Sequence, residues 1–397
     1  MKPVSEIRRE WRCLVAALVG TALGAPTLPF YTIGIFAPIL AREFGWSLAT
    51  IFGGLLLNTV VLLVGGPIVG HVVDRLGARI VAAFSLAGLG LGYAAFALST
   101  ESVLQYYLTW AFLAIAGLGS TSIAFTRALN STFVVRRGLA LGIALSGIGL
   151  CALTMKSLAG WLLDIAGWRM TMATIGLMPV VIGAPFVLWG LPDDTDRRRP
   201  LEASLPSLTL GQAIRTRTFA MLVGSFVLIS FANGAPLPHL ENILRSARLD
   251  AAQILTLTSS IGVAVIAGRL VGGWLLDRVW APLAGVAVSF AAAVGCWLLS
   301  QPTLEPSHAI VAILLLGFCG GVEGDLLSYL IARYFGVRSY GAVYGTIFGL
   351  FALGAGAGPS LIGYAYDRLG SYSQILMTCA VLLLVAAALL LCLGRYP

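Results

Sequence analysis

Charge is scarce in this sequence. Asp, Glu, Lys and Arg make up 11% of the 397 residues, whereas soluble proteins carry about 25%. Because 58% of the residues are hydrophobic, the polar ones are too few to cover a surface that faces water. A soluble globular protein is therefore excluded, and the lipid bilayer is the expected solvent.

Paired cysteines, metal-binding clusters and nucleotide-binding loops are missing as well. The six cysteines lie in or beside apolar runs without paired spacing, which excludes a disulfide framework and a metal site. The net charge of +8 is spread between apolar runs rather than gathered in a patch with aromatics, so we expect no nucleic-acid partner. Without a soluble domain or a cofactor motif, a membrane-bound enzyme or receptor is disfavoured, and we expect no cofactor.

The sequence is instead rich in long apolar runs. A spanning helix needs about 20 mostly apolar residues, and the chain contains twelve such runs, at 13–40, 47–72, 79–99, 103–133, 138–163, 170–191, 217–242, 252–276, 281–300, 308–335, 340–366 and 372–394. We therefore predict an all-α membrane protein with a six-helix bundle over 1–191, a polar linker over 192–216 and a second six-helix bundle over 217–397.

Basic residues favour one side of the membrane. With the N-terminus in the cytoplasm, the cytoplasmic segments hold about sixteen Lys and Arg residues. The outer segments then hold five, Arg42, Arg169, Arg245, Arg248 and Arg368. We expect both termini and the linker to be cytoplasmic. The near-exclusive use of Arg over Lys hints at a GC-rich bacterial genome, and hence at a bacterial inner membrane.

The two halves repeat one another in four places. The matches, in the same order in both halves, are GTALGAPTLP (20–29) with SFANGAPLP (230–238), GGPIVGHVVDR (65–75) with GRLVGGWLLDR (268–278), RRGLALGIALSGIG (136–149) with RSYGAVYGTIFGLFALG (338–354), and GWLLDIAGWR (160–169) with GYAYDRLGSY (363–372). A six-plus-six repeat places the substrate site between the halves near the membrane midplane, with alternating access.

The turn after the second run, GHVVDRLGAR at 70–79, combines a carboxylate with basic residues. Asp74 ends a helix, where it can accept hydrogen bonds from the N-terminus of a neighbouring helix and meet its positive dipole. Gly77 permits a tight turn. Arg75 and Arg79 are available to pair with carboxylates or lipid phosphates.

This stretch resembles the loop motif between helices two and three of the major facilitator superfamily, G-x-x-x-D-R-x-G-x-R, which begins here at Gly70. A degenerate copy, Asp277 and Arg278, ends the eighth run. The resemblance implies the major facilitator fold, twelve helices in two pseudo-symmetric bundles, and an inner gate in which these residues latch the two halves.

Within the superfamily the chain resembles the monocarboxylate porters and the bacterial oxalate/formate-type carriers. RRGLALGIALSGIGL (136–150), running on to GWR (167–169), looks like their helix-five signature, and FGWS (44–47) is typical of the bacterial members. The resemblance spans essentially the whole chain and implies transport of a small organic anion.

Five charged residues fall within the apolar runs: Arg127, Lys156, Arg269, Glu323 and Asp325. A charge inside a span costs about 2.5–3.5 kcal/mol on insertion scales and indicates a functional site by default. We interpret Arg127 and Lys156 as residues that extend toward the membrane surface. A second anion contact is the alternative for Arg127.

Arg269 lies about two turns from the inner end of the eighth run. The resemblance implies that it is the helix-eight arginine that holds the substrate carboxylate in monocarboxylate porters. A guanidinium suits that task because it stays charged and offers a bidentate fork. The alternative is a structural ion pair with Glu323 or Asp325.

Glu323 and Asp325 are two positions apart on one helix, so they point in different directions and do not form a paired acid–base site. One is expected to face the cavity and the other a neighbouring helix. A carboxyl group out of water holds its proton more readily, which makes both candidates for proton coupling or gating. Structural pairing is the alternative.

Three positions depart from the family pattern. Proton-linked animal members carry an acidic residue one turn before the helix-eight arginine, where this chain has Val265, and a lysine in helix one, where residues 29–34 read PFYTIG. Oxalate-type carriers have a lysine in helix eleven, and residues 340–366 contain none. One cation in the C-terminal half suits one carboxylate better than two.

Further side chains fall at heights that could reach a central site: Phe30, Tyr31, Asn233, Tyr329, Tyr344 and Phe348. Aromatic walls with a few polar groups suit a small organic anion, and helix packing uses the same residue types. We predict a secondary transporter of a small organic anion, a monocarboxylate, functional as a monomer and working by proton symport or anion exchange.

A proton makes that transport electroneutral, because the membrane potential opposes anion entry by about 2.3 kcal/mol per charge per 100 mV. The alternative with the same fold is a proton-driven efflux antiporter for drugs or cations, which would use Glu323 or Asp325 as its cation site and leave Arg269 structural.

Overall fold

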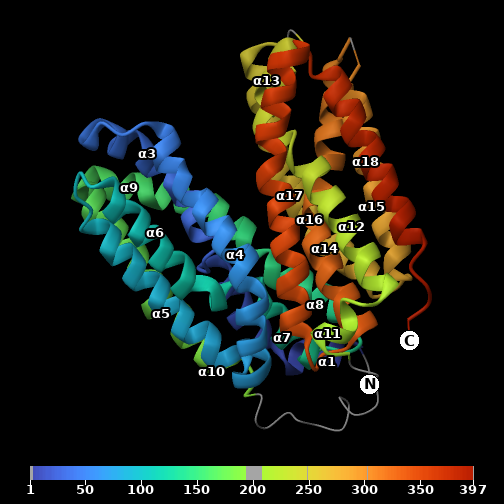
Figure 1. The fold of residues 1–397 in the computed structure, drawn as a ribbon, viewed down its shortest axis with the longest axis horizontal. Helices are drawn as coiled ribbons and strands as arrows, with labels where there is room; N and C mark the ends of the chain where they lie inside the picture. Colours follow the sequence, from blue (N-terminus) through green and yellow to red (C-terminus); the bar gives the residue numbers. More distant parts are fainter. Residues whose placement is uncertain (1–2, 194–207, 248, 302, 397) are drawn as a thin grey trace. The chain divides into compact units, whose positions relative to one another are not determined.

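The structure, a computed structural model, describes residues 3–193, 208–247, 249–301 and 303–396. Within these ranges it is helical and contains no β-strand, as predicted (Figure 1). The N-terminal half contains α1 (Pro3–Arg9), α2 (Trp11–Ala22), α3 (Leu28–Phe44), α4 (Leu48–Leu76), α5 (Ala78–Ala97), α6 (Val103–Gly117), the 3₁₀ turn η1 (Leu118–Ser120), α7 (Ser122–Thr132), α8 (Arg137–Leu145), α9 (Gly147–Met178), the π-helical turn η2 (Pro179–Gly183) and α10 (Ala184–Gly190).

The C-terminal half contains α11 (Leu210–Ala213), α12 (Arg217–Gly234), the 3₁₀ turn η3 (Leu237–His239), α13 (Leu240–Ser246), α14 (Ala251–Leu276), α15 (Ala281–Leu299), α16 (Pro306–Phe335), α17 (Tyr340–Leu369) and α18 (Ser373–Leu391).

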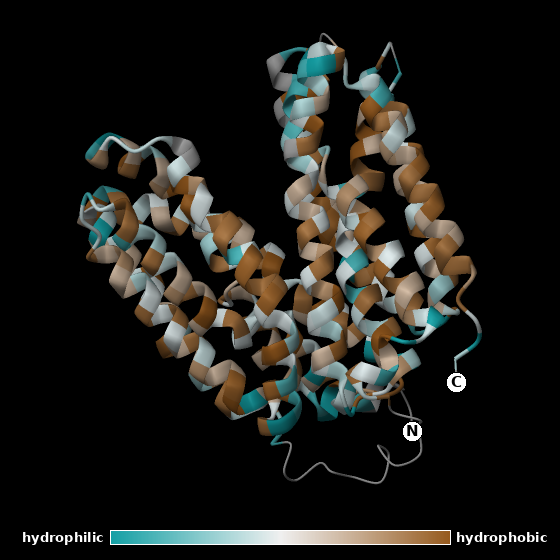
Figure 2. Cartoon of the chain, viewed as in Figure 1, coloured by the Kyte–Doolittle hydropathy of each residue, from teal (hydrophilic) through white to brown (hydrophobic). Residues whose placement is uncertain are grey.

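Eleven helical segments in the described residues are long and apolar enough to cross a membrane, from Thr50–Leu76 to Ser373–Leu391. They coincide with the second to twelfth apolar runs. The first run is divided, because α2 and α3 flank the segment 23–27, which contains Gly24 and Pro26. These two helices occupy the first apolar run. Hydrophobic colour covers the middle of the spans and hydrophilic colour gathers toward their ends (Figure 2).

The fifth and sixth runs meet at a kink rather than at the loop expected over 164–169. α9 is continuous from Gly147 to Met178 except at Gly167, whose φ of +72° lies in the left-handed region. Glycine adopts that region at little cost because it lacks a Cβ.

The helices form two compact units. Unit 1 comprises 1–136, 143–207 and 336–349, and unit 2 comprises 137–142, 208–335 and 350–397. The start of α8 thus packs within unit 2, and the start of α17 packs within unit 1.

In unit 1, α5 packs against α6, α9 and α10, α4 packs against α6, and α2 packs against α10. In unit 2, α16 packs against α12, α14 and α15, and α18 packs against α12 and α15 (Figure 1). α16 is therefore the central helix of its unit, and most of its second half is buried.

Glycines bring helix backbones into direct contact at repeated positions. In unit 1 a Cβ on Gly70 of α4 would lie 2.0 Å from the Gly341 carbonyl of α17, and a Cβ on Gly345 would lie 2.2 Å from the Gly66 carbonyl. Such distances are too short for any other residue. Small residues of this kind are the usual means of close helix packing in membranes.

Unit 2 repeats the arrangement. A Cβ on Gly138 of α8 would lie 2.3 Å from the Gly273 carbonyl of α14, and a Cβ on Gly142 would lie 2.2 Å from the Arg269 carbonyl. The four glycine-rich stretches involved are the ones that the sequence pairs as internal repeats, so the same contact is built twice from repeated sequence.

Candidate functional site

Arg269 and Asp325 form an ion pair inside unit 2. The Nη1 atom of Arg269, on α14, donates to Oδ1 of Asp325, on α16, over 3.1 Å. The arginine is 7% exposed and the aspartate fully buried. Of the two partners that the sequence left open for Arg269, the structure pairs it with Asp325.

Several polar atoms in and around the Arg269–Asp325 pair lack a hydrogen bond. Nε of Arg269 and Oδ2 of Asp325 are buried without a hydrogen-bond partner among the described residues, and so is Oε2 of Glu323. Arg269 also interacts electrostatically with both carboxyl groups. Buried polar atoms are nearly always hydrogen-bonded. One guanidinium nitrogen and two carboxyl oxygens without partners therefore mark this pair as a candidate site for a further polar group.

Glycines hold the two helices of the pair together. A Cβ on Gly268 of α14 would lie 2.3 Å from the Phe318 carbonyl, and a Cβ on Gly321 of α16 would lie 2.2 Å from the Val265 carbonyl. The backbones of α14 and α16 therefore touch along the turn of α14 that precedes Arg269, which fixes the height at which its side chain leaves α14.

Gly142 is the residue of the helix-five signature that reaches this site. A Cβ there would meet not only the Arg269 carbonyl but also, at 3.5 Å, Oδ2 of Asp325. We expect Gly142→Ala to push α8 away from α14. If the chain is the transporter that the sequence predicts, its rate should fall about tenfold or more, because small displacements at a binding site cost orders of magnitude in rate. Initial rates of substrate uptake in liposomes measure the effect.

Gly262→Ala is the matched control, because a Cβ at Gly262, also on α14, meets nothing within 4 Å. It is expected to leave uptake unchanged. Equal rates for Gly142→Ala and the wild type would show that the close approach of α8 does not matter to transport.

The other predicted lining residues of unit 2 are buried by helix packing. In the orientation that satisfies both ends of its amide, Asn233 of α12 donates to the Leu316 carbonyl over 3.2 Å and accepts from the Gly320 amide over 3.3 Å. Its side chain therefore ties α12 to α16. Tyr329 is 8% exposed on α16, and the guanidinium of Arg333 lies 5.8 Å from its ring.

The predicted aromatics of unit 1 lie in two places. Phe30 and Tyr31 stand at the start of α3 with their rings 5.2 Å apart, and Phe30 is 60% exposed. Tyr344 of α17 is buried between Tyr340 and Phe348, with ring centroids 5.5 and 5.3 Å away. Phe30 is thus the predicted lining residue with the most free surface.

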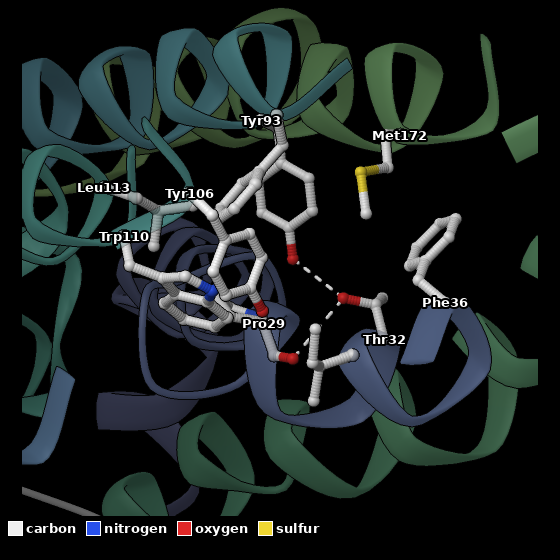
Figure 3. Close-up of a pocket in the computed structure, with 10 residues that line it drawn as sticks. Pro29, Thr32, Phe36, Tyr93, Tyr106, Trp110, Leu113 and Met172 are labelled. Carbon is white, nitrogen blue, oxygen red and sulfur yellow. Dashed lines mark hydrogen bonds between the residues drawn. The ribbon is translucent and has the colours of Figure 1, made fainter. Parts of the chain in front are cut away.

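A small cavity inside unit 1 lies between α3, α5, α6 and α9 (Figure 3). The hydroxyl of Tyr93 points to that of Thr32 across it, 2.8 Å away, and Nε1 of Trp110 is buried without a hydrogen-bond partner in the described residues. None of the ten residues that line it is charged. Its volume of about 20 Å³ is room for one water molecule, so this cavity is too small for an organic anion.

Asp74 caps a helix in unit 1. Its two carboxylate oxygens accept from the backbone amides of Gly341 and Ala342, over 2.9 and 3.0 Å, at the N-terminus of α17. This is the contact expected from its place at the end of α4. In addition Nε of Arg127 donates to Asp74 over 2.8 Å, and both side chains are less than a tenth exposed.

The rest of the 70–79 motif shapes the turn and its surface. Gly77 has φ of +90°, which explains the glycine between α4 and α5. Arg79 lies 3.9 Å from Asp193, and Arg75 is exposed. The motif therefore joins a buried helix cap to a basic surface.

Asp277 repeats the cap in unit 2. Its carboxylate accepts from the amides of Gly138 and Leu139, over 2.6 and 3.0 Å, at the start of α8. The next residue, Arg278, lies over the ring of Trp274 at 3.9 Å. Two carboxylates at repeated positions thus cap the first turns of two helices that also repeat.

Two repeated, capped helices and a charged pair inside the spans fit a transporter built from internal repeats. The sequence profile of the Major Facilitator Superfamily matches residues 13–359. The chain belongs to the major facilitator superfamily. It is therefore a multi-pass membrane transporter that handles a small molecule, and not an enzyme.

This major facilitator protein is similar to named relatives over most of its length. It is 27% identical to monocarboxylate transporter 11 of Mus musculus over 399 residues, which covers 96% of this chain and 87% of that protein. It is 26% identical to the gallate transporter of Pseudomonas putida over 379 residues, 83% of each chain. The solved structure of the human organic anion transporter MFSD10 superposes with a TM-score of 0.71, covering 96% of this chain and 99% of the other at 20% identity.

Sequence reasoning missed two partners in this major facilitator chain. It assigned Arg127 to the membrane surface, whereas the structure pairs it with Asp74. It did not single out Glu6, a buried residue of α1 that accepts from the amides of residues 134–136 ahead of α8, with distances from 2.9 to 3.4 Å. An acidic residue within a basic N-terminal segment was the available signal.

The side chain of Lys156 is not among those that the structure describes. Within the described residues, no three His, Cys, Asp or Glu side chains gather in a way that could hold a metal ion.

Proposed function

We propose that this transporter carries a small organic anion, a monocarboxylate, and that Arg269 binds the substrate carboxylate. The observation that carries the proposal is the buried Arg269–Asp325 pair with an unpartnered Nε. Similarity to a monocarboxylate transporter and to a gallate transporter supports the same substrate class.

The guanidinium can serve two carboxylates at once. Nη1 is bonded to Asp325, while the edge formed by Nε and Nη2 carries no hydrogen bond to a described residue. A carboxylate matches that edge with two parallel hydrogen bonds. Substrate binding then adds one negative charge to a site that holds one arginine and two carboxyl groups.

We assign the compensating proton to Glu323 or Asp325. A proton on Asp325 would weaken its bond to Arg269 and leave the arginine to the substrate. A proton on Glu323 would remove a second negative charge from the surroundings of Arg269. Either way proton and anion move together without net charge, which avoids about 2.3 kcal/mol per 100 mV of membrane potential. Exchange of one anion for another achieves the same balance.

The caps at Asp74 and Asp277 form the proposed inner gate, with Gly70, Arg75, Gly77, Arg79 and Arg278 as its remaining members. We propose that Phe30, Tyr31, Asn233, Tyr329 and Tyr344 contribute to the substrate path directly or by packing. The distribution of basic residues supports a cytoplasmic location for both termini. The near-exclusive use of Arg over Lys supports a bacterial inner membrane, and we propose that the protein functions as a monomer.

Transport by the Glu323→Gln variant tests the coupling. The purified full-length protein is reconstituted in liposomes, and uptake of labelled lactate, pyruvate, benzoate, gallate and oxalate is followed with and without an inward proton gradient. If Glu323 carries the proton, gradient-driven uptake should fall at least about tenfold, the scale of losing one positioned proton-transfer group. Exchange between internal and external substrate should survive.

Glu305→Gln is the control, because that carboxylate is exposed ahead of α16. Unchanged gradient stimulation in Glu323→Gln would move the coupling role to Asp325. If no carboxylate moves in the wild type, the anion proposal is wrong, and efflux of lipophilic cations becomes the next assay.

A further inference from the structure

An apolar groove runs along one side of α4 in unit 1, between α4, α5 and the end of α6. It has a volume of about 470 Å³, and its walls include Val60, Val64, Ile68 and Val72 of α4 and Ile115 of α6. Val64 and Ile68 are each 65% exposed. Exposed apolar side chains are expected on any span that faces lipid, so the feature that marks this place is the groove between them.

The groove faces away from α17. Gly66 and Gly70 place one side of α4 against α17. At 3.6 residues per turn, Val64, Ile68 and Val72 lie on the opposite side. The groove is therefore on the side of α4 that packing within unit 1 leaves uncovered, and in a spanning helix that side meets lipid.

The length of the groove matches one leaflet. Val60 and Val72 are twelve positions apart, which at 1.5 Å per residue is about 18 Å. Half of the hydrocarbon core is about 15 Å. Since Val72 is one turn from the end of α4 at Leu76, the groove spans the leaflet that adjoins the turn between α4 and α5.

Arg75 continues the row of groove residues at the membrane surface. It follows Val64, Ile68 and Val72 at helical spacing, whereas Asp74, one position earlier, turns toward α17. Arg75 is exposed, and it has no ion pair or hydrogen bond with any residue in the described ranges. A free guanidinium thus lies directly below an acyl-sized groove.

We propose that this groove binds an acyl chain of an anionic phospholipid, whose phosphate pairs with Arg75. The apolar walls and leaflet length fit one chain, and the cation at the membrane end fits a headgroup with net negative charge. A zwitterionic headgroup gains less, because its own amine already balances the phosphate.

The repeat supplies a natural comparison. Arg278 occupies the position of Arg75 in unit 2, but its guanidinium lies 3.9 Å from the Trp274 ring and donates to the Trp274 carbonyl over 3.4 Å. Trp274 stands where α4 has His71. The arginine of unit 2 is therefore held by its own helix, so the proposed lipid site belongs to unit 1 alone.

Lipid binding by the purified full-length protein tests the proposal. Phosphatidylglycerol and phosphatidylethanolamine with identical acyl chains are titrated against the protein in detergent, and retained lipids are counted by native mass spectrometry. We expect the wild type to retain phosphatidylglycerol in preference to phosphatidylethanolamine. Arg75→Gln should weaken the phosphatidylglycerol affinity about fivefold, the effect of one arginine at a membrane surface, and Arg278→Gln should not.

A second variant tests binding of the acyl chain separately from recognition of the headgroup. Val64→Trp fills the groove and should lower retention of both lipids, whereas Leu91→Trp, on an exposed site of α5 outside the groove, should lower neither. Equal affinities for the two lipids, no change in Arg75→Gln, or full retention by a monodisperse Val64→Trp protein would each overturn the proposal. Transport assays are not involved, so this result is independent of the substrate assignment.

Discussion

Arg269→Gln is expected to abolish carboxylate uptake and to destabilise the protein. The substitution removes the charged fork proposed to hold the substrate, a loss of about 30-fold or more in affinity for a buried charge pair. It also leaves Asp325, which is fully buried, without its partner. Breaking a buried ion pair in this way costs about 3–5 kcal/mol. Uptake in liposomes and thermal unfolding in detergent measure the two effects.

The double variant Arg269→Gln/Asp325→Asn separates binding from stability. It removes both charges of the pair, so the unfolding temperature should recover toward that of the wild type while uptake stays absent. Recovery of uptake together with stability would mean that the pair has only a structural role. Normal uptake by Arg269→Gln alone would eliminate Arg269 as the substrate contact.

Asp74→Asn is expected to produce the second-largest effect. The carboxylate accepts from two amides of α17 and from Arg127. The single oxygen of an asparagine cannot replace both carboxylate oxygens, and the buried ion pair between Arg127 and Asp74 would be broken. We expect a loss of about 3–5 kcal/mol in stability, seen as a lower unfolding temperature, and a matching loss of transport.

Adding Arg127→Gln to Asp74→Asn removes both charges of the pair and should restore part of the stability, although not the cap. If Asp74→Asn unfolds at the wild-type temperature, the hydrogen bonds to α17 contribute little, and the proposed gate loses its main contact.

The apolar runs predicted the spans because a helix needs about 20 apolar residues to cross the hydrocarbon core, whatever its tertiary packing. Local backbone breaks were less visible. The run 13–40 gave no sign that Gly24 and Pro26 would separate α2 from α3, and Gly167 bends a helix at a place where a loop was expected. These features depend on a few residues and on packing. Hydropathy averaged over a whole span does not register either of them.

The sequence was enough to predict which residues belong to the site, but not which of them pair with one another. Arg269, Glu323 and Asp325 were identified because charge within a span is costly. Which carboxylate meets Arg269 depends on the rotation of α16 against α14, which is set by glycine contacts such as that of Gly321. The bond from Arg127 to Asp74 joins residues 53 positions apart, and no local pattern reports such a pairing.

The two helix caps differ in when they can form during synthesis. Asp277 meets amides that precede it by 138 and 139 positions, so its partners are already in the membrane when α14 is inserted. Asp74 must wait for amides that follow it by 267 and 268 positions, near the end of translation. Until then Arg127, available much sooner, is its counter-charge. The nascent chain can therefore complete the cap on α8 first. The part of unit 1 that is made first stays without its cap on α17 until translation is almost complete.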